Sequence, residues 1–180
     1  FSKTLSTMVN SDLLIKLHNP HQLNPAMSSF DDVGITLRKP IGPDRSLLIA
    51  WAESHFPSLW VDEIQHALGN HPVSCWLAQQ ADNLLGFACY DATALGFFGP
   101  LGVIESAQGK GIGSALARAC FHEMYLKGYR YAIIGRTQAE GFYRRIAPVI
   151  VIPDSDPGCY SETLMLKAGS SRLPLTHDTE

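Results

Sequence analysis

The spacing of apolar side chains divides the chain, from residue 34 onward, into short strands and helices. Residues 34–39 alternate between apolar and polar side chains and end at Pro40, which is typical of a strand. Two helical patterns follow, over residues 43–56 and 58–68, and Gly69 stands just beyond the second. The domain is therefore expected to open with one strand and two amphipathic helices.

Three extended runs come next. Residues 75–80 and 84–90 are joined by a turn-like Ala-Asp-Asn, which predicts a β-hairpin. Residues 95–103 form a third strand that glycines interrupt. Helical spacing then returns over residues 112–127, where Gly128 closes a long helix.

The remaining elements complete a mixed pattern. A continuous apolar run predicts a buried strand at residues 131–135, and a short helix follows at 139–146. Two late strands are expected at 149–152 and 163–166. This order is not a regular βαβ repeat, so it predicts an α/β (α+β) fold. We expect a single mixed, mostly antiparallel central sheet of about six or seven strands, flanked by about four helices.

The N-terminal residues 1–31 differ from the rest of the chain. They mix Ser, Asn, His and Pro, and only residues 13–17 have strand or short-helix character. We therefore expect an N-terminal extension over residues 1–31, partly disordered or with one docked segment. A single domain over residues 32–168 and a C-terminal tail over residues 169–180 follow it.

The composition narrows the class of protein. The chain has 180 residues, of which 46% are hydrophobic and 17% charged, as in an ordinary globular domain. Its net charge of −3 gives no support to a nucleic-acid or anionic-membrane partner. No apolar run approaches the roughly 18–20 residues of a membrane span, and no signal-peptide pattern opens the chain. A cytoplasmic monomer or homodimer is expected.

The cysteines and histidines do not have the spacing of a metal site. The seven histidines form no HxxxH or Cys/His ligand pattern, so no metal is expected. The four cysteines form no CxxC pair, and three of them lie in apolar runs. Free thiols in a reducing compartment are the expected state of all four: Cys75, Cys89, Cys120 and Cys159.

A glycine-rich loop, Gln-Gly-Lys-Gly-Ile-Gly-Ser at residues 108–114, stands between the third extended run and the long helix. Its glycines allow a close approach of the backbone to an anion, and the first helical N–H groups supply partial positive charge. Lys110 either adds a full charge there or is an ordinary solvated lysine. The loop therefore predicts a site for a pyrophosphate.

Two familiar phosphate motifs do not fit this loop. A Walker A loop needs Ser or Thr after Gly-Lys to hold magnesium, but Gly111 follows Lys110. A dinucleotide fingerprint has the spacing GxGxxG, and here the third glycine, Gly113, comes one place early. Nucleotide hydrolysis is therefore disfavoured.

The loop resembles a third motif, the Gln/Arg-x-x-Gly-x-Gly/Ala acetyl-CoA signature of the GNAT superfamily of N-acetyltransferases. Val103 supplies the apolar residue five positions before Gln108, and Tyr143 matches a tyrosine that the family carries in a short late helix. The element order agrees from about residue 34 to 166. There are departures: Gln108 replaces the more frequent Arg, and an Asn and a Gly-Phe of the family are missing from the C-terminal half.

The resemblance implies a cofactor site for acetyl-CoA as the acyl donor. The pantetheine chain would pair with the third extended run, and the loop would hold the pyrophosphate. The residues implied in binding are Leu101, Gly102, Val103, Gln108, Gly109, Lys110, Gly111, Ile112, Gly113, Ser114 and Tyr143.

The catalytic residues are less well indicated. Tyr143 is the candidate general acid for the departing CoA thiolate, the alternative being a tyrosine packed in the core. An amine of pKa about 10 must lose a proton before it attacks. Asp91 and Glu105 are the nearest carboxylates that the sequence offers as a base, although each also fits an ordinary exposed acid beside a water relay.

The expected function is an N-acetyltransferase that moves the acetyl group of acetyl-CoA to a primary amine of a small molecule or peptide by direct attack. A non-catalytic acyl-CoA sensor is the alternative, because no base is firmly identified. The amine acceptor itself leaves no recognisable pattern in the sequence.

Overall fold

The computed structural model of the chain describes residues 11–23, 30 and 32–164. The helices are α1 (Pro20–Leu23), α2 (Asp44–His55), α3 (Ser58–Gly69), α4 (Ile112–Leu126) and α5 (Glu140–Arg144), with short 3₁₀ turns η2 (Glu105–Ala107) and η3 (Cys159–Glu162). The strands are β1 (Ser11–Lys16), β2 (Ile35–Arg38), β3 (Cys75–Gln80), β4 (Asn83–Tyr90), β5 (Phe98–Val103), β6 (Tyr131–Thr137) and β7 (Val149–Val151). The predicted α+β fold is confirmed.

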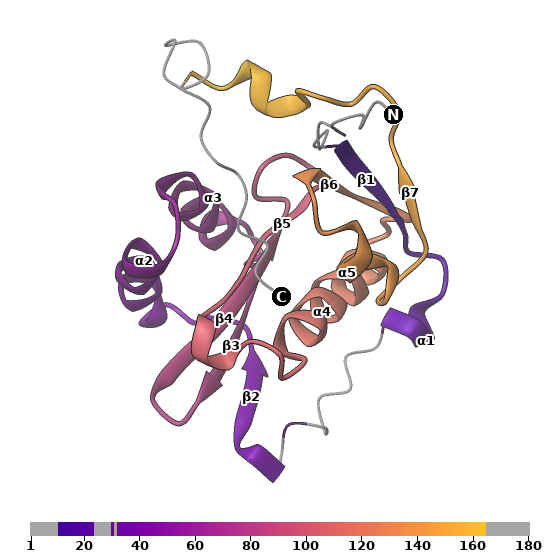
Figure 1. The fold of residues 1–180 in the computed structure, drawn as a ribbon. Coiled ribbons are helices and arrows are strands. Elements are labelled where there is room, and N and C mark those ends of the chain that lie inside the picture. Colours follow the sequence, from indigo (N-terminus) through magenta and orange to yellow (C-terminus); the bar gives the residue numbers. More distant parts are fainter. Residues whose placement is uncertain (1–10, 24–29, 31, 165–180) are drawn as a thin grey trace, which may run out of the picture.

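The strands form two antiparallel sheets rather than the single sheet that the sequence predicted (Figure 1). Four strands pair in the order β2-β3-β4-β5, and three pair in the order β6-β1-β7. A parallel bridge between Phe97 and Ile133 joins them, with the Ile133 N–H donating to the Gly96 carbonyl at 2.9 Å. Within the described residues no ladder continues from this bridge, so β5 and β6 diverge.

The composition of β5 explains why pairing stops there. Pro100 has no N–H to donate, and Gly99 has a φ of +128°. A strand with both features cannot hold a regular ladder on each edge. β5 therefore pairs with β4 alone, with Phe87 opposite Gly102 and Ala88 opposite Leu101.

The centre of the three-stranded sheet comes from the N-terminal segment. Ile15 of β1 lies opposite Ala132 of β6 and Val149 of β7, and its side chain is fully buried. The sequence placed residues 11–16 in an N-terminal extension with one docked segment, and in the structure they form a strand of the sheet. Of the strand predicted at 163–166, Thr163 and Leu164 are not in a strand, and the rest lies outside the described residues.

Two cores lie on opposite faces of the four-stranded sheet. Helices α2 and α3 cover one face, around Phe87 and Ile64, while α4 covers the other, around Leu116 and Phe121 (Figure 1). β4 is buried on both sides from Leu85 onward. As predicted, the four cysteines, all of which lie among the described residues, form no disulfide, and three are buried in these cores. None of the helices described is long and apolar enough to cross a membrane.

The burial of β1 leads to a prediction about stability. Ile15→Ala should lower the free energy of unfolding by about 3 kcal/mol, because it leaves a cavity where three strands meet. Leu14→Ala, on the half-buried face of the same strand, should cost only about 1 kcal/mol. Urea unfolding measures both, and equal small losses would show that β1 is a dispensable segment.

Candidate functional site

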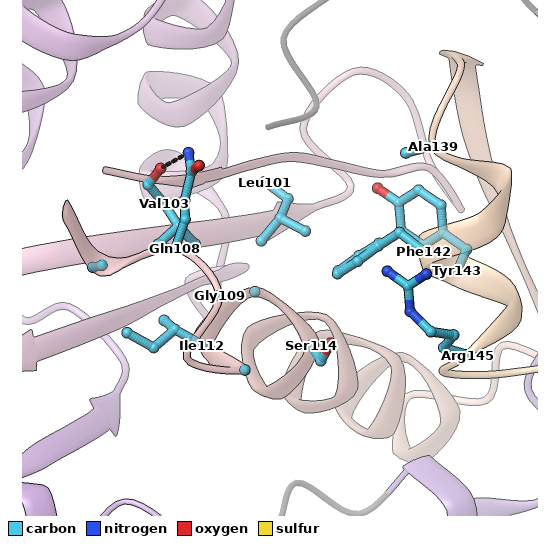
Figure 2. Close-up of a pocket in the computed structure, with 13 residues that line it drawn as sticks. Leu101, Val103, Gln108, Gly109, Ile112, Ser114, Ala139, Phe142, Tyr143 and Arg145 are labelled. Atoms are coloured by element: carbon cyan, nitrogen blue, oxygen red, sulfur yellow. Dashed lines mark hydrogen bonds between the residues drawn. The ribbon is translucent and has the colours of Figure 1, made fainter. Parts of the chain in front are cut away.

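A cleft of about 280 Å³ opens where β5, the glycine-rich loop, the first turn of α4 and helix α5 meet (Figure 2). Its walls are mainly apolar side chains and glycine backbone. The lining residues are Leu101, Val103, Ala107, Gln108, Gly109, Gly111, Ile112, Gly113, Ser114, Ala139, Phe142, Tyr143 and Arg145.

The cleft gathers all but two of the residues that the sequence assigned to cofactor binding. Lys110 is exposed and does not line it. Gly102 faces the opposite side of the sheet, where an added Cβ would lie 2.6 Å from the ring of Phe56. Gly102 therefore makes room for a core aromatic ring, while Leu101 and Val103 on either side of it face the cleft.

The glycine-rich loop has the geometry of an anion site. Gly109 and Gly111 have φ angles of +71° and +80°, a region that residues with a Cβ rarely adopt. Gly111 is the N-cap of α4, and no side chain caps the helix among the residues described. The first backbone bond that the cap accepts comes from Ala115, at 3.0 Å. The helical N–H groups before Ala115 have no intrahelical acceptor and are free for an anion.

Gln108 has a different part in this loop. Its side-chain Nε2 donates to the Val103 carbonyl at 3.1 Å, which ties the loop to the end of β5 (Figure 2). Gln108 also lines the cleft, so the contact to the cofactor that the resemblance implies stays a prediction.

Arg145 brings a positive charge to the cleft from another element. Its side chain extends from the end of α5 beside Phe142 and Tyr143 (Figure 2). A neighbouring hollow of about 360 Å³ shares Arg145 and adds Arg118 and Arg144. Sequence analysis missed Ala107, Ala139, Phe142 and Arg145; the basic pair after Tyr143 was the available signal for the last of these.

Tyr143 stands at the inner end of the cleft. Its side chain is 4% exposed, and its ring meets Phe142 and Phe98 edge-on, with centroids 5.0 and 6.0 Å away. It also lines a smaller hollow on the far side of the β5–β6 gap. The tyrosine therefore lies where the two spaces meet.

The two carboxylates that the sequence offered as a base lie elsewhere. Asp91 is buried and accepts hydrogen bonds from the Tyr129 hydroxyl, at 3.0 and 3.1 Å, and from the Gly96 N–H at 2.8 Å. Lys127 also pairs with it at 3.5 Å. Glu105 is exposed at η2. Neither lines the cleft, and Asp91 serves to hold the turn after β4.

A resident metal finds no obvious ligands in the described part of the chain. Residues 11–23, 30 and 32–164 contain no group of three His, Cys, Asp or Glu side chains placed to hold an ion.

The fold and the cleft define a mixed α+β domain whose glycine-rich helix start faces a gap between two sheets. A family model described as "Acetyltransferase (GNAT) family" matches residues 45–147, more than half of the chain. The chain belongs to this family. No curated protein matches it.

Several solved structures share the fold. A GCN5-related glucosamine N-acetyltransferase region of a fungal multi-domain β-N-acetylglucosaminidase superposes with a TM-score of 0.62 at 15% identity, over 79% of this chain. GCN5-related N-acetyltransferases from Sphaerobacter thermophilus and Kribbella flavida superpose with TM-scores of 0.58 and 0.52, at 25% and 16% identity, over 79% and 82% of the chain. The matched regions are 19%, 48% and 59% of those three proteins, so the chain spans only part of each.

The loop geometry predicts a stability difference between two glycines. Gly111→Ala should lower the free energy of unfolding by about 1–2 kcal/mol, because alanine is strained at a positive φ. Gly141→Ala is the matched control: no atom lies within 4 Å of its added Cβ, and its φ is not in the left-handed range. Chemical denaturation should show no loss for Gly141→Ala, and equal effects would contradict the strain argument.

Proposed function

We propose that the protein is an N-acetyltransferase that moves the acetyl group of acetyl-CoA to a primary amine of a small molecule or peptide. The observation that carries this proposal is one cleft in which a helix N-terminus, the open end of β5 and Tyr143 face the same space. Family membership supports acetyl transfer in general.

The shape of the cleft suits an extended donor. The pyrophosphate would lie at the N-terminus of α4, where uncapped N–H groups and the helix dipole favour an anion. The pantetheine arm would then run along Leu101 and Val103, in the gap that β6 leaves beside β5. The thioester would reach the inner end of the cleft, beside Tyr143.

The arginines favour CoA over a smaller acyl donor. Arg118, Arg144 and Arg145 line the hollow that continues from the cleft. CoA carries a 3′-phosphate in addition to its pyrophosphate, and guanidinium groups bind phosphate well. Because Gln108 stands where the family more often has Arg, the loop has one positive charge fewer. Arg145 would supply that charge from α5's end of the cleft.

Tyr143 is the general acid in this proposal. When the amine attacks the thioester carbonyl, a tetrahedral intermediate forms, and a β5 N–H facing the gap would stabilise its oxyanion. Collapse of the intermediate breaks the C–S bond, and the Tyr143 hydroxyl protonates the sulfur. A thiol of pKa about 8.5 leaves fairly well without help, so the gain should lie near the low end of general-acid effects.

The central experiment separates an enzyme from a binding module. Acetyl-CoA should raise the melting temperature, and free thiol should appear when primary amines are added to the protein with acetyl-CoA. Stabilisation by acetyl-CoA without thiol release for any amine would indicate an acyl-CoA sensor. No stabilisation at all would reject the donor assignment.

Tyr143→Phe should lower kcat by about 100-fold, because the leaving thiolate loses its proton donor. The KM for acetyl-CoA should stay within about twofold, since the ring remains in place. Tyr131→Phe, a change on an exposed side chain of β6, is the matched control and should retain full activity. An unchanged kcat for Tyr143→Phe would exclude the general-acid role.

Arg145→Met should raise the KM for acetyl-CoA about tenfold, because a charge-assisted contact to phosphate is worth about 1.5–3 kcal/mol. Arg130→Met removes an exposed arginine that stacks on Tyr125, away from the cleft, and should have no effect. The effect of Arg145→Met should shrink as salt is added. A salt-independent KM equal to that of the wild type would show that Arg145 does not bind the donor.

A further inference from the structure

A second, smaller hollow of about 60 Å³ lies on the other side of the β5–β6 gap. It is lined by α3, β5, β6, α5 and η3, and it shares Leu101 and Tyr143 with the donor cleft. A thioester placed beside Tyr143 is therefore open to this hollow. Its size admits the reacting end of an unhindered molecule, while the remainder would stay outside.

Among the residues that the structure describes, Glu63 is the one carboxylate that lines this hollow. It lies on the buried face of α3, beside Ile64 and Ala67, and its side chain is 6% exposed. A carboxylate in such surroundings costs free energy unless it is paired. Among the described residues no cation pairs with it, so packing alone does not account for its presence.

The hydrogen bonds of Glu63 are one-sided. The Thr93 hydroxyl donates to Oε1 at 2.5 Å, and the Tyr160 hydroxyl donates to the same oxygen at 3.2 Å. The hydroxyl oxygens of Thr93 and Tyr160 also lie 3.4 Å apart, so two hydroxyls from separate segments of the chain hold one oxygen in place. Both hydrogen bonds are made to Oε1, and no hydrogen bond to Oε2 is found within the described residues. The carboxylate is thus oriented and keeps one oxygen available to a ligand.

The surroundings of Glu63 favour a proton acceptor. Burial raises the pKa of its carboxyl above the ordinary value, although the hydrogen bonds from Thr93 and Tyr160 oppose this shift. A base with a raised pKa is better matched to proton transfer near neutral pH. The titratable and charged groups that face it are Asp62 on its own helix, Cys89 on β4, Arg136 on β6, Tyr143 on α5 and Tyr160 on η3.

We propose that this hollow receives the acceptor as an unhindered primary ammonium group and that Glu63 Oε2 takes its proton. The proposal rests on the acetyltransferase function proposed above. The carboxylate, between the aromatic walls of Trp60 and Tyr160, attracts the cation. In this proposal the general base is Glu63 of α3, and not Asp91 or Glu105.

The ammonium gives one proton to Glu63, and the free amine forms the C–N bond to the acetyl carbon. The C–S bond breaks, its electron pair goes to sulfur, and sulfur takes the Tyr143 proton. The second proton lost by the nitrogen restores Tyr143, and Glu63 releases its proton to solvent. The products are the amide, CoA thiol and one proton.

Glu63→Gln tests this role, because glutamine keeps the size and the acceptor oxygen but cannot take a proton. At neutral pH, kcat/KM for an alkylamine should fall by about 100-fold or more, with the KM for acetyl-CoA unchanged. The difference from wild type should shrink along a series of primary amines of decreasing pKa, since such amines arrive already deprotonated. A purely structural role would give the same loss for every amine.

The pH profile gives a second signature. Wild-type kcat/KM should fall as pH drops through the raised pKa of Glu63, because the carboxylate must be ionised to accept a proton. The Glu63→Gln variant should not show this fall of kcat/KM at low pH. Glu53→Gln, on the exposed surface of α2, is the matched control and should keep the wild-type profile. Tyr160→Phe, which leaves Thr93 to orient Oε1, should cause a smaller loss than Glu63→Gln.

A measurement of stability needs no turnover. The carboxyl has a higher pKa in the folded state than its ordinary value, so wild type loses stability as pH rises through that folded pKa. The Glu63→Gln variant should not show this loss of stability with rising pH. At neutral pH its free energy of unfolding should therefore be at least that of wild type.

The possible results are distinct. An active wild type whose Glu63→Gln variant keeps full rates for all amines overturns the role of Glu63 and leaves the acetyltransferase function intact. A wild type that binds acetyl-CoA and acetylates no amine overturns both. An amine-dependent loss in Glu63→Gln supports the proposal.

Discussion

The divergence of β5 from β6 is the constraint on which the rest of the structure depends. The strands meet at the Phe97–Ile133 bridge and then separate, because Gly99 and Pro100 interrupt regular pairing along β5. The same gap opens the cleft proposed for the acyl donor on one side and the Glu63 hollow on the other. The two spaces share Leu101 and Tyr143, and both result from the lack of regular pairing between β5 and β6.

The width of that gap is set by residues far apart in the chain. β6 is held from the other side by β1, which lies between β6 and β7 and buries Leu13 and Ile15 in the core. β5 is held by β4, where Gly86 allows the Gly102 carbonyl to approach, 2.7 Å from where a Cβ would be. The N-terminal strand is therefore part of the framework that positions the proposed active site.

The two sides of the gap are lined by different charged groups, and both Glu63 and Arg136 line the smaller hollow. Arginines of α4 and α5 and the N-terminus of α4 lie on the donor side, where a polyanionic CoA would bind. The buried carboxylate of Glu63 lies on the side proposed for a cationic amine. Tyr143 lies between them in an apolar setting. In low-dielectric surroundings such fixed groups act strongly on charge that develops in the transition state.

Local patterns were enough to predict helices α2 to α5, the β3–β4 hairpin and the loop before α4, because helix caps, turns and apolar periodicity depend on near neighbours. They did not reveal that residues 11–16 form the central strand or that the sheet divides, since pairing over more than a hundred residues leaves no local mark. The carboxylates chosen by proximity in sequence, Asp91 and Glu105, lie away from the cleft, whereas Glu63 reaches the gap through packing of α3. The sequence by itself determined the glycine-rich start of α4 and the family; only the tertiary structure decided which side chains meet across the gap, because that depends on how separate elements pack.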